Sequence, residues 1–291
     1  MQSRVAVVTM VRDDAFFLTK WVQYYGGLFG RENLYVINHG HGEAVRGIAS
    51  GCNVMGIPGD PHKNFDGKRW RMFNGLINGL RGYYTHVICG DVDELVVTDP
   101  ASGGTLADYL FSKRAGQVLT PIGLELVHVR DRESDAIDDK ILGPRRHVQH
   151  LTAYSKPCII SVPTRLSRGG HFTDFAKLET PEYLYLFHLK YCDFDIFGSA
   201  MDGRNEAVRQ MELENPKDGM VGRHWFPQFR KDEETFAGFS AMHVEEDFDF
   251  TDIRAVMHDS WQSRNQGARW HFRTFTSPVL HVVPDRFFGI F

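Results

Sequence analysis

A short apolar run that ends in three carboxylates places the strongest constraint on how this chain folds. Residues 86–89 have the length and β-branched content of a buried strand, and Gly90 lets the chain turn out of it. Asp91, Asp93 and Glu94 follow directly. The spacing of the two aspartates points both side chains to the same side of an extended segment, where their charges repel each other. Such a pair is typical of a Mg²⁺ or Mn²⁺ site on a diphosphate, although an acidic loop tip in water is the alternative.

The segments before this run predict alternating strands and helices. Buried strands are expected at residues 5–10 and 34–38 and a weaker one at 53–57, with helices that begin near Ala15 and after residue 65. This order favours a mostly parallel sheet flanked by helices, which is the α/β class. Open sheets of this class bind ligands beyond the carboxyl ends of their strands, and the two aspartates lie at such an end.

Polar and basic side chains at other strand and helix ends are candidates for contacts with a nucleotide. Thr9 and Arg12 end the first strand and Asn38 ends the second, so we expect them to line a pocket for the base and ribose. Lys68 and Arg71 occupy the first turn of a helix, where the helix dipole disfavours cations. A diphosphate at this helix start would offset that mismatch, so we expect one of the two to contact it. The alternative is a pair of solvated basic residues.

Composition and charge argue against several other classes of protein. The chain of 291 residues carries a net charge of −4, so it offers no basic field for nucleic acid or an anionic membrane. It contains no run of about 20 apolar residues that could span a membrane. Its start shows no signal-peptide pattern, and its four cysteines are far apart in the sequence. Free thiols and a cytoplasmic location are therefore expected.

Three motifs in this order resemble the GT-A type of nucleotide-sugar-dependent glycosyltransferase, and more narrowly its family 2-like group. They are Val11-Arg-Asp-Asp14, then Leu18-Thr-Lys-Trp21 with Tyr24-Tyr25, and finally Asp91-Val-Asp-Glu94. The match is good over residues 4–97, fair to about residue 200 and poor beyond. Three positions depart from the pattern of the group, namely Asp14, His39 and Leu95.

The resemblance implies a GT-A-like, Rossmann-like catalytic domain over residues 1–200. Residues 201–291 are expected to form a helical elaboration that belongs to the same domain and contributes to the acceptor side. One helix is expected there over residues 201–214 and another within residues 248–261, with Thr251 as its cap. Within the catalytic domain, the charge-rich residues 131–140 are expected to form a mobile surface loop.

The resemblance also implies a histidine that closes the site near the metal ion. His188, in a strand over residues 183–191, is the first candidate and His171 is the second. An imidazole beside a carboxylate suits Mn²⁺ better than Mg²⁺. We therefore expect Asp93 and His188 to hold the ion, with Asp91 as a further ligand or as a contact to the ribose or to a metal-bound water. A core histidine bonded to the backbone is the alternative for both histidines.

These features predict a metal-dependent glycosyltransferase. It would move a sugar from a nucleotide diphosphate sugar, with UDP as the favoured nucleotide, to a hydroxyl of a glycan or glycoconjugate acceptor. The resemblance implies inversion at the sugar, and that reaction requires a base near the acceptor hydroxyl. Glu125, Asp193 and Asp195 are the candidates for this base, and the sequence does not rank them.

Three alternatives remain open from the sequence. A sugar nucleotidylyltransferase usually carries a glycine-rich loop after its first strand, where this chain has residues 9–14 without a glycine. A glycoside hydrolase would use two carboxylates and would need neither nucleotide nor metal. A non-catalytic glycan-binding protein would bind sugar without consuming a nucleotide sugar.

Overall fold

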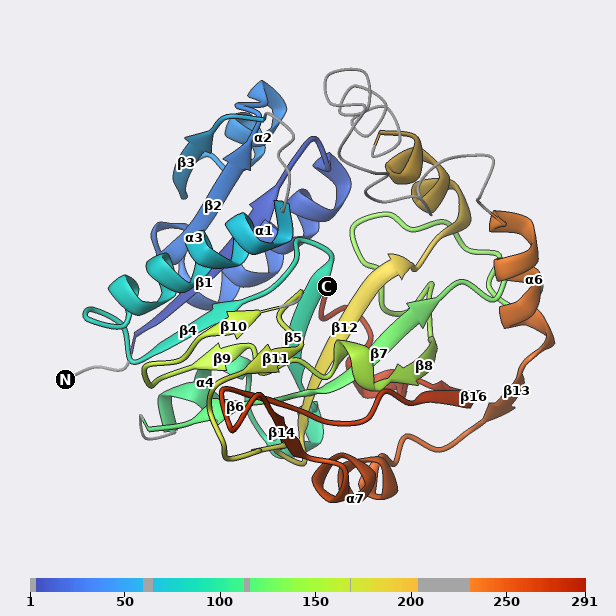
Figure 1. Ribbon diagram of the computed structural model, residues 1–291. Helices are drawn as coiled ribbons and strands as arrows, with labels where there is room; N and C mark the ends of the chain where they lie inside the picture. The colour runs from blue at the N-terminus through green and yellow to red at the C-terminus, as the bar shows by residue number, and fades with distance from the viewer. Residues whose placement is uncertain (1–3, 60–64, 113–115, 168, 204–230) are drawn as a thin grey trace, which may run out of the picture.

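The protein combines three β-sheets with flanking helices, and the computed structural model describes residues 4–59, 65–112, 116–167, 169–203 and 231–291. Figure 1 shows the strands of the first sheet that precede residue 90 in blue to cyan, beside a second sheet whose strands run from teal and green through yellow to red. Helices and strands alternate through the first half of the chain, so the α/β class is confirmed. The expected mostly parallel character is not, because antiparallel pairs occur in every sheet. No helix in the described part of the chain has both the length and the apolar character that a membrane span requires.

The first sheet has six strands in the order β3-β2-β1-β4-β9-β6. The four strands from β3 to β4 are parallel, as the sequence predicts, and β9 is antiparallel to both β4 and β6. All but one residue of β1 are buried, as expected for a central strand covered on both faces. The strands are β1 Val5–Val11, β2 Leu34–His39, β3 Asn53–Ile57, β4 His86–Cys89, β6 Val118–Leu119 and β9 Ile159–Ile160.

Helices cover both faces of the first sheet because the side chains of β1 alternate between the faces. Val5 and Val7 pack in one buried cluster with α1 and α2, whereas Ala6 and Val8 pack in another cluster with α3. The aromatic stripe of α1 lies in the first cluster, and each of its buried rings contributes about 1.5–3 kcal/mol by leaving water. The helices are α1 Ala15–Phe29, α2 Glu43–Ile48, α3 Phe65–Leu80 and α4 Leu106–Ser112, with short 3₁₀ turns at η1 Arg31–Asn33, η2 Pro100–Ser102, η3 Thr152–Tyr154 and η6 Asp285–Phe287.

The second sheet has six strands in the order β13-β16-β8-β7-β12-β5. Strand β4 of the first sheet leads into β5 through residues 90–93, so the carboxylate stretch is a junction between the two sheets. The register of β12 places His188 opposite Glu94 on β5 and opposite Glu125 on β7. The strands are β5 Glu94–Thr98, β7 Ile122–Val127, β8 His147–Leu151, β12 Leu184–Tyr191, β13 His243–Glu245 and β16 Thr276–Val282.

A second connection between the sheets lies beside the first. Residues 152–158 lead from β8 to β9, and the amide of Cys89 donates a hydrogen bond of 2.9 Å to the carbonyl of Cys158. Gly123 on β7 holds this connection, because its amide donates to Oγ of Ser155 at 2.8 Å. A Cβ at this glycine would lie 2.2 Å from the backbone of the connection. Only glycine therefore allows the connection to pack this closely on the sheet.

The C-terminal region is not the helical elaboration expected over residues 201–291. Its strand β16 pairs with β8 and so belongs to the second sheet, while β14 and β15 join a small antiparallel sheet with β10 and β11. The region is mixed rather than helical, because the short strand segment at 276–282, interrupted by Pro278 and His281, carries no pattern that separates strand from helix. The elements are α6 Asp232–Ala241, α7 Thr251–Asp259, β10 Leu166–Ser167, β11 Phe172–Thr173, β14 Gln262–Arg264 and β15 Arg269–His271.

The two helices expected in this region have different outcomes. Helix α7 confirms the one expected within residues 248–261, with Thr251 as its first residue. Of the helix expected over 201–214, residues 201–203 are helical and the rest lie outside the described residues.

The charge-rich segment expected to be a mobile loop is held by two buried side chains. Glu133 is 5% exposed and Arg145 is 1% exposed, and both bind the backbone on either side of the segment. Residues 131–140 lie in no helix or strand and most of them are exposed, so the surface loop is confirmed, and its mobility stays a prediction. Glu133 accepts from the amides of Val129 and Arg146 and contacts the ring of His147, while Arg145 donates to the carbonyls of Asp135, Pro144 and Cys192 and to the carboxylate of Asp193.

His150 gives the folding stability a predictable dependence on pH. Its ring on β8 is fully buried, Nδ1 donates to the carbonyl of Gly123 at 3.0 Å, and Nε2 has no partner among the described residues. Burial lowers the pKa of His150 from 6.5 to about 4, so unfolding takes up a proton as the pH falls below 6.5. Between pH 7.5 and pH 5, this residue should therefore lower the free energy of unfolding by about 2 kcal/mol.

Chemical denaturation at both pH values would measure this effect. His150→Asn is the matched variant, because its amide can keep the hydrogen bond to Gly123, and it should lose about 2 kcal/mol less than the wild type over the same interval. Equal losses in the two proteins would contradict the assignment.

Candidate active site

The two aspartates lie where the strand order of the first sheet reverses. From β1 the chain runs outward through β2 and β3, and it then crosses back to β4 on the other side of β1. Open α/β sheets commonly bind ligands at such a point. Oγ1 of Thr9 donates a hydrogen bond of 3.1 Å to the carbonyl of Gly90 and ties the two strand ends together. Asp91 follows immediately.

Asp91 is held by two cations. Nη2 of Arg69 on α3 donates to Oδ1 of Asp91, and Nζ of Lys156 donates to Oδ2 at 3.2 Å. Lys156 also donates to the buried carboxylate of Glu94. Burial on its own would raise the pKa of the Asp91 carboxyl, but the charges of Arg69 and Lys156 outweigh it and lower that pKa below its ordinary range. Asp91 is thus ionised, and side chains of the protein neutralise it.

Asp93 faces a histidine that a second carboxylate orients. Nε2 of His188 lies 3.7 Å from Oδ2 of Asp93, and Nδ1 lies 2.8 and 2.9 Å from the two oxygens of Glu125. The ring of Tyr154 stacks on the imidazole at 3.9 Å between centroids. Burial would lower the pKa of His188, but the carboxylates of Glu125 and Asp93 outweigh it and raise that pKa above its ordinary value. All three polar side chains are nearly inaccessible to solvent.

Asp93 and His188 offer two facing ligand atoms for the predicted cation, whereas the oxygens of Asp91 are already engaged. Because Nδ1 of His188 donates its proton to Glu125, Nε2 is the nitrogen that can bind an ion, and binding there would displace any proton it carries. A carboxylate that orients a ligating histidine in this way is common in metal sites. Both oxygens of Asp91 instead accept hydrogen bonds from cations. Two of the three predicted ligands therefore face each other, and the third is engaged elsewhere.

Another group of ligand atoms lies at the opposite edge of the second sheet. Glu245, Asp247 and His281 bring three such atoms within 4.8 Å of one another. The carboxylates are largely exposed, and Nδ1 of His281 already pairs with Asp247 at 2.8 Å. Strand β13, which carries Glu245, is separated from β5 by the whole width of the sheet, so this group is distinct from the Asp93 site.

The three residues predicted to line a base and ribose pocket lie at the carboxyl ends of β1 and β2. Besides the contact of Thr9, Nη1 of Arg12 donates to the carbonyl of Gly59 at 2.9 Å. The amide of Asn38 exchanges two hydrogen bonds, of 2.9 and 3.0 Å, with the backbone of Gly42. These side chains stabilise the loops at these strand ends, and their contact with a nucleotide stays a prediction.

On α3, the cation that reaches the site is Arg69, which the sequence analysis missed. Lys68 and Arg71, the predicted residues, have exposed side chains. The signal that could have found Arg69 is helical spacing, because it precedes the buried residues Phe73 and Ile77 by four and eight positions and so lies on the face turned to the sheet. Lys156 offered no comparable signal, since it lies in a connection without periodicity.

The three candidate bases have different surroundings. Glu125 binds His188, as described above. Asp193 precedes a helix over residues 194–203, where Oδ1 accepts the amide of Asp195 at 3.0 Å, and its Oδ2 accepts from Arg145 at 2.5 Å. Asp195 lies in the first turn of that helix with an exposed side chain. Of the three, Asp195 is therefore the most accessible to an acceptor.

His171, the second candidate for a metal ligand, belongs to the same neighbourhood. Its imidazole would lie 2.9 Å from a Cβ at Gly169, so it packs against the glycine pair that precedes it. Burial and the charge of Lys156 lower the pKa of His171 to about 4, which keeps the ring neutral.

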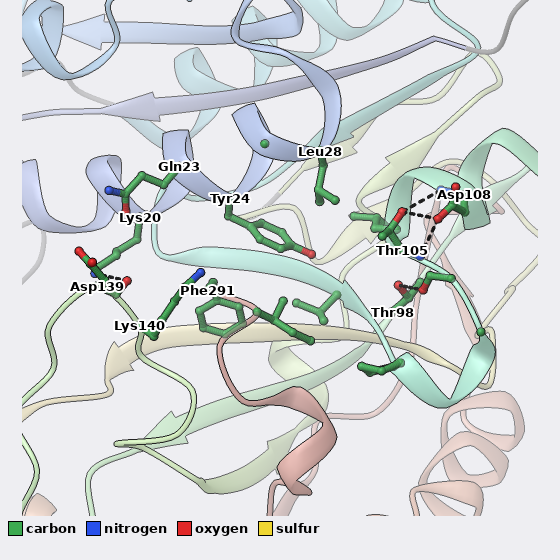
Figure 2. A pocket seen from close by; sticks show the side chains of 17 residues that line it. Lys20, Gln23, Tyr24, Leu28, Thr98, Thr105, Asp108, Asp139, Lys140 and Phe291 are labelled. Carbon is green, nitrogen blue, oxygen red and sulfur yellow. Dashed lines mark hydrogen bonds between the residues drawn. The ribbon is translucent and has the colours of Figure 1, made fainter.

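A large pocket among the described residues lies away from Asp93 and His188. Figure 2 shows this pocket of about 980 Å³, with Lys20 and Asp139 at one end, Thr105 and Asp108 at the other, and Tyr24, Leu28 and Phe291 between them. None of the predicted site residues lines it. Its end groups bind neighbours already, because Nζ of Lys20 donates to two backbone carbonyls and Asp108 accepts from Thr105. The convergent carboxylate and imidazole groups, Asp93, Glu125 and His188, therefore lie outside this pocket.

Comparisons with known proteins leave the family of this chain open. No family model matches the sequence, and no curated protein matches it. Among solved structures, the chain is similar to the crystal structure of mannose-1-phosphate geranyltransferase from Thermus thermophilus. The two are 13% identical with a TM-score of 0.29, and the match covers 82% of this chain and 68% of the other. A likeness this weak supports no conclusion about activity.

Proposed function

We propose that the protein is a metal-dependent glycosyltransferase of the GT-A type, which moves a sugar from a nucleotide diphosphate sugar to a hydroxyl of a glycan or glycoconjugate. The observation that supports this most is that Asp93, His188 and Glu125 meet beside the point where the strand order reverses. Open α/β sheets bind nucleotides at such a point, and the carboxylate–histidine pair suits Mn²⁺ or Mg²⁺. UDP is the nucleotide that we favour.

Each residue of the site has a separate role in the proposed reaction. A bound cation would neutralise the charge that builds on the leaving diphosphate. Glu125 keeps the proton of His188 on Nδ1 and so directs Nε2 toward Asp93, while Tyr154 fixes the plane of the imidazole. Asp195 is the base that we propose for the acceptor hydroxyl, with inversion at the sugar, because its carboxylate is exposed.

A thermal-shift panel tests this function. UDP, GDP, CDP and ADP would each be added with Mn²⁺, with Mg²⁺ and with EDTA. A ligand at a hundredfold excess over its dissociation constant stabilises the native state by about 2.7 kcal/mol. For a protein of this size that corresponds to a rise of roughly 5–10 °C in Tm. We expect one nucleotide, UDP, to give such a rise with a divalent cation and a smaller rise in EDTA.

The other functions predict different results. No rise with any nucleotide would contradict the proposal and favour a hydrolase or a glycan-binding protein. Pyrophosphate release from a nucleoside triphosphate and a sugar phosphate would favour a nucleotidylyltransferase. The cytoplasmic location that we propose with this function is compatible with four free thiols.

A further inference from the structure

We propose that Arg69 and Lys156 bind the diphosphate of the donor directly, and that Asp91 positions these two cations instead of binding a metal ion. This inference rests on the proposed function and assigns the anionic part of the substrate to residues of the chain. The two aspartates of the Asp-x-Asp stretch then have different roles. Asp91 holds the two cationic side chains, and Asp93 faces His188.

The first observation is the charge balance around Asp91. Two cations, Arg69 and Lys156, meet two carboxylates, Asp91 and Glu94, so the cluster is neutral. The exposed fraction of the side chain falls from 30% in Asp91 and 17% in Arg69 to 7% in Lys156 and 1% in Glu94. The cluster is therefore reached from the side of Asp91 and Arg69. Buried ion pairs are weak evidence for stability, so the place of this cluster at the carboxyl end of β4 is compatible with a role in ligand binding.

The second observation is that the two cations have N–H donors to spare. A guanidinium carries five, and Asp91 is the hydrogen-bond acceptor for Arg69 among the described residues. The rings of Trp70 and Phe73 lie 5.7 and 5.2 Å from the guanidinium carbon and hold its plane. Lys156 has three N–H donors and uses two, one to Asp91 and one to Glu94. A diphosphate, with its adjacent anionic oxygens, can accept from both side chains at once.

The third observation is an unpaired donor beside the same cluster. Trp70, Asp91, Lys156 and two consecutive glycines surround a narrow gap, which a ligand would have to widen in order to enter. Nε1 of Trp70 is buried and has no hydrogen-bond partner among the described residues. A Cβ at Gly170 would lie 2.9 Å from the Trp70 ring, so only glycine lets the backbone at this position pack so closely on that ring. An anion bound by the two cations would also give this N–H an acceptor.

These contacts separate the tasks of the two aspartates. Both oxygens of Asp91 bind cations, whereas Asp93 faces the nitrogen of His188 that can bind an ion. The cations at Asp91 would hold the diphosphate whether or not a metal ion is bound. Removal of the metal should therefore weaken nucleotide binding without abolishing it.

Calorimetric titration of the full chain with UDP and with UMP tests this inference. Arg69→Met should weaken UDP binding about tenfold or more, because a charge-assisted contact to the diphosphate is lost, and should change UMP binding less than about threefold. Arg69→Lys should recover part of the affinity for UDP. Arg46→Met, which removes an exposed arginine paired with Glu43 on α2, is the matched control and should bind like the wild type.

The two aspartates are compared in the same titrations, with Mn²⁺ and with EDTA. Asp91→Asn should weaken UDP binding by a similar factor in both conditions, whereas Asp93→Asn should weaken it in Mn²⁺ alone. Equal UDP affinity in the wild type and Arg69→Met would overturn the inference while leaving the proposed function intact. A loss in Asp91→Asn confined to Mn²⁺ would restore Asp91 as a metal ligand and overturn its positioning role. A wild type that binds none of UDP, GDP, CDP and ADP would overturn the proposed function itself.

Discussion

Asp93→Asn should lower the turnover of the donor sugar by about a hundred- to a thousandfold and leave the fold intact. The substitution keeps the shape of the side chain and removes its charge. Asp93 is 5% exposed and its Oδ2 lies 3.7 Å from Nε2 of His188, so the variant loses the carboxylate half of the proposed ion site. His188 remains oriented by Glu125 and stacked on Tyr154, and the local structure should therefore persist.

The measurement is the rate of UDP release from the UDP-sugar that the wild type consumes, at saturating donor and Mn²⁺. Circular dichroism and the Tm without ligand would check the fold of the variant. Asp247→Asn is the matched control, because Asp247 belongs to the distant group of metal-ligand atoms, and its turnover should stay within about twofold of the wild type. Wild-type turnover in Asp93→Asn would remove the metal site from the mechanism.

Much of the first sheet could be predicted because its strands carry the pattern of a buried parallel sheet. The apolar runs of β1, β2 and β4 are covered on both faces, and such runs stand out against the helical spacing of α1 and α3. Alternation of strand and helix then leaves few topologies open. The reversal of strand order between β1 and β4, which locates the candidate site, follows from pairing between distant segments and had to come from the structure.

The second sheet was harder to predict because its strands come from separate parts of the chain. Strand β16 reaches β8 across more than a hundred residues, and no local pattern encodes such a pairing. Its short sequence also carries no periodicity that separates strand from helix. Gly123 illustrates the same limit, because its requirement for glycine arises from a connection that packs on it from a remote segment.

The candidate site shows the same division between local and distant signals. Asp91, Asp93 and His188 were predicted as a neighbourhood, and the structure brings them to one junction between the sheets. Their individual tasks were not predicted, since these depend on Arg69, Lys156 and their contacts. Arg69 had a helical signal that was overlooked, whereas Lys156 enters from a connection that only the folded chain places beside Asp91.

Arg145→Met should destabilise the fold by about 3–5 kcal/mol. The guanidinium is 1% exposed, and it donates to the carbonyls of Asp135 and Cys192 and to the carboxylate of Asp193. Methionine fills much of the volume but leaves these acceptors buried without a donor. The free-energy cost of the unpaired acceptors exceeds the stabilisation from the added apolar contacts. The Tm should fall by roughly 10 °C, since each kcal/mol shifts it by about 2–4 °C in a protein of this size.

The neighbouring arginine provides the control for this prediction. Arg146 is 41% exposed and pairs with Asp285 at 3.4 Å, so Arg146→Met should change the free energy of unfolding by less than about 1 kcal/mol. Urea denaturation of both variants separates a buried network from a surface ion pair. Because Arg145 joins the segment after β7 to the start of the helix that carries Asp195, its loss should also lower transfer at a temperature where the variant is still folded. Equal stability of the two variants would show that the Arg145 network does not hold this segment in place.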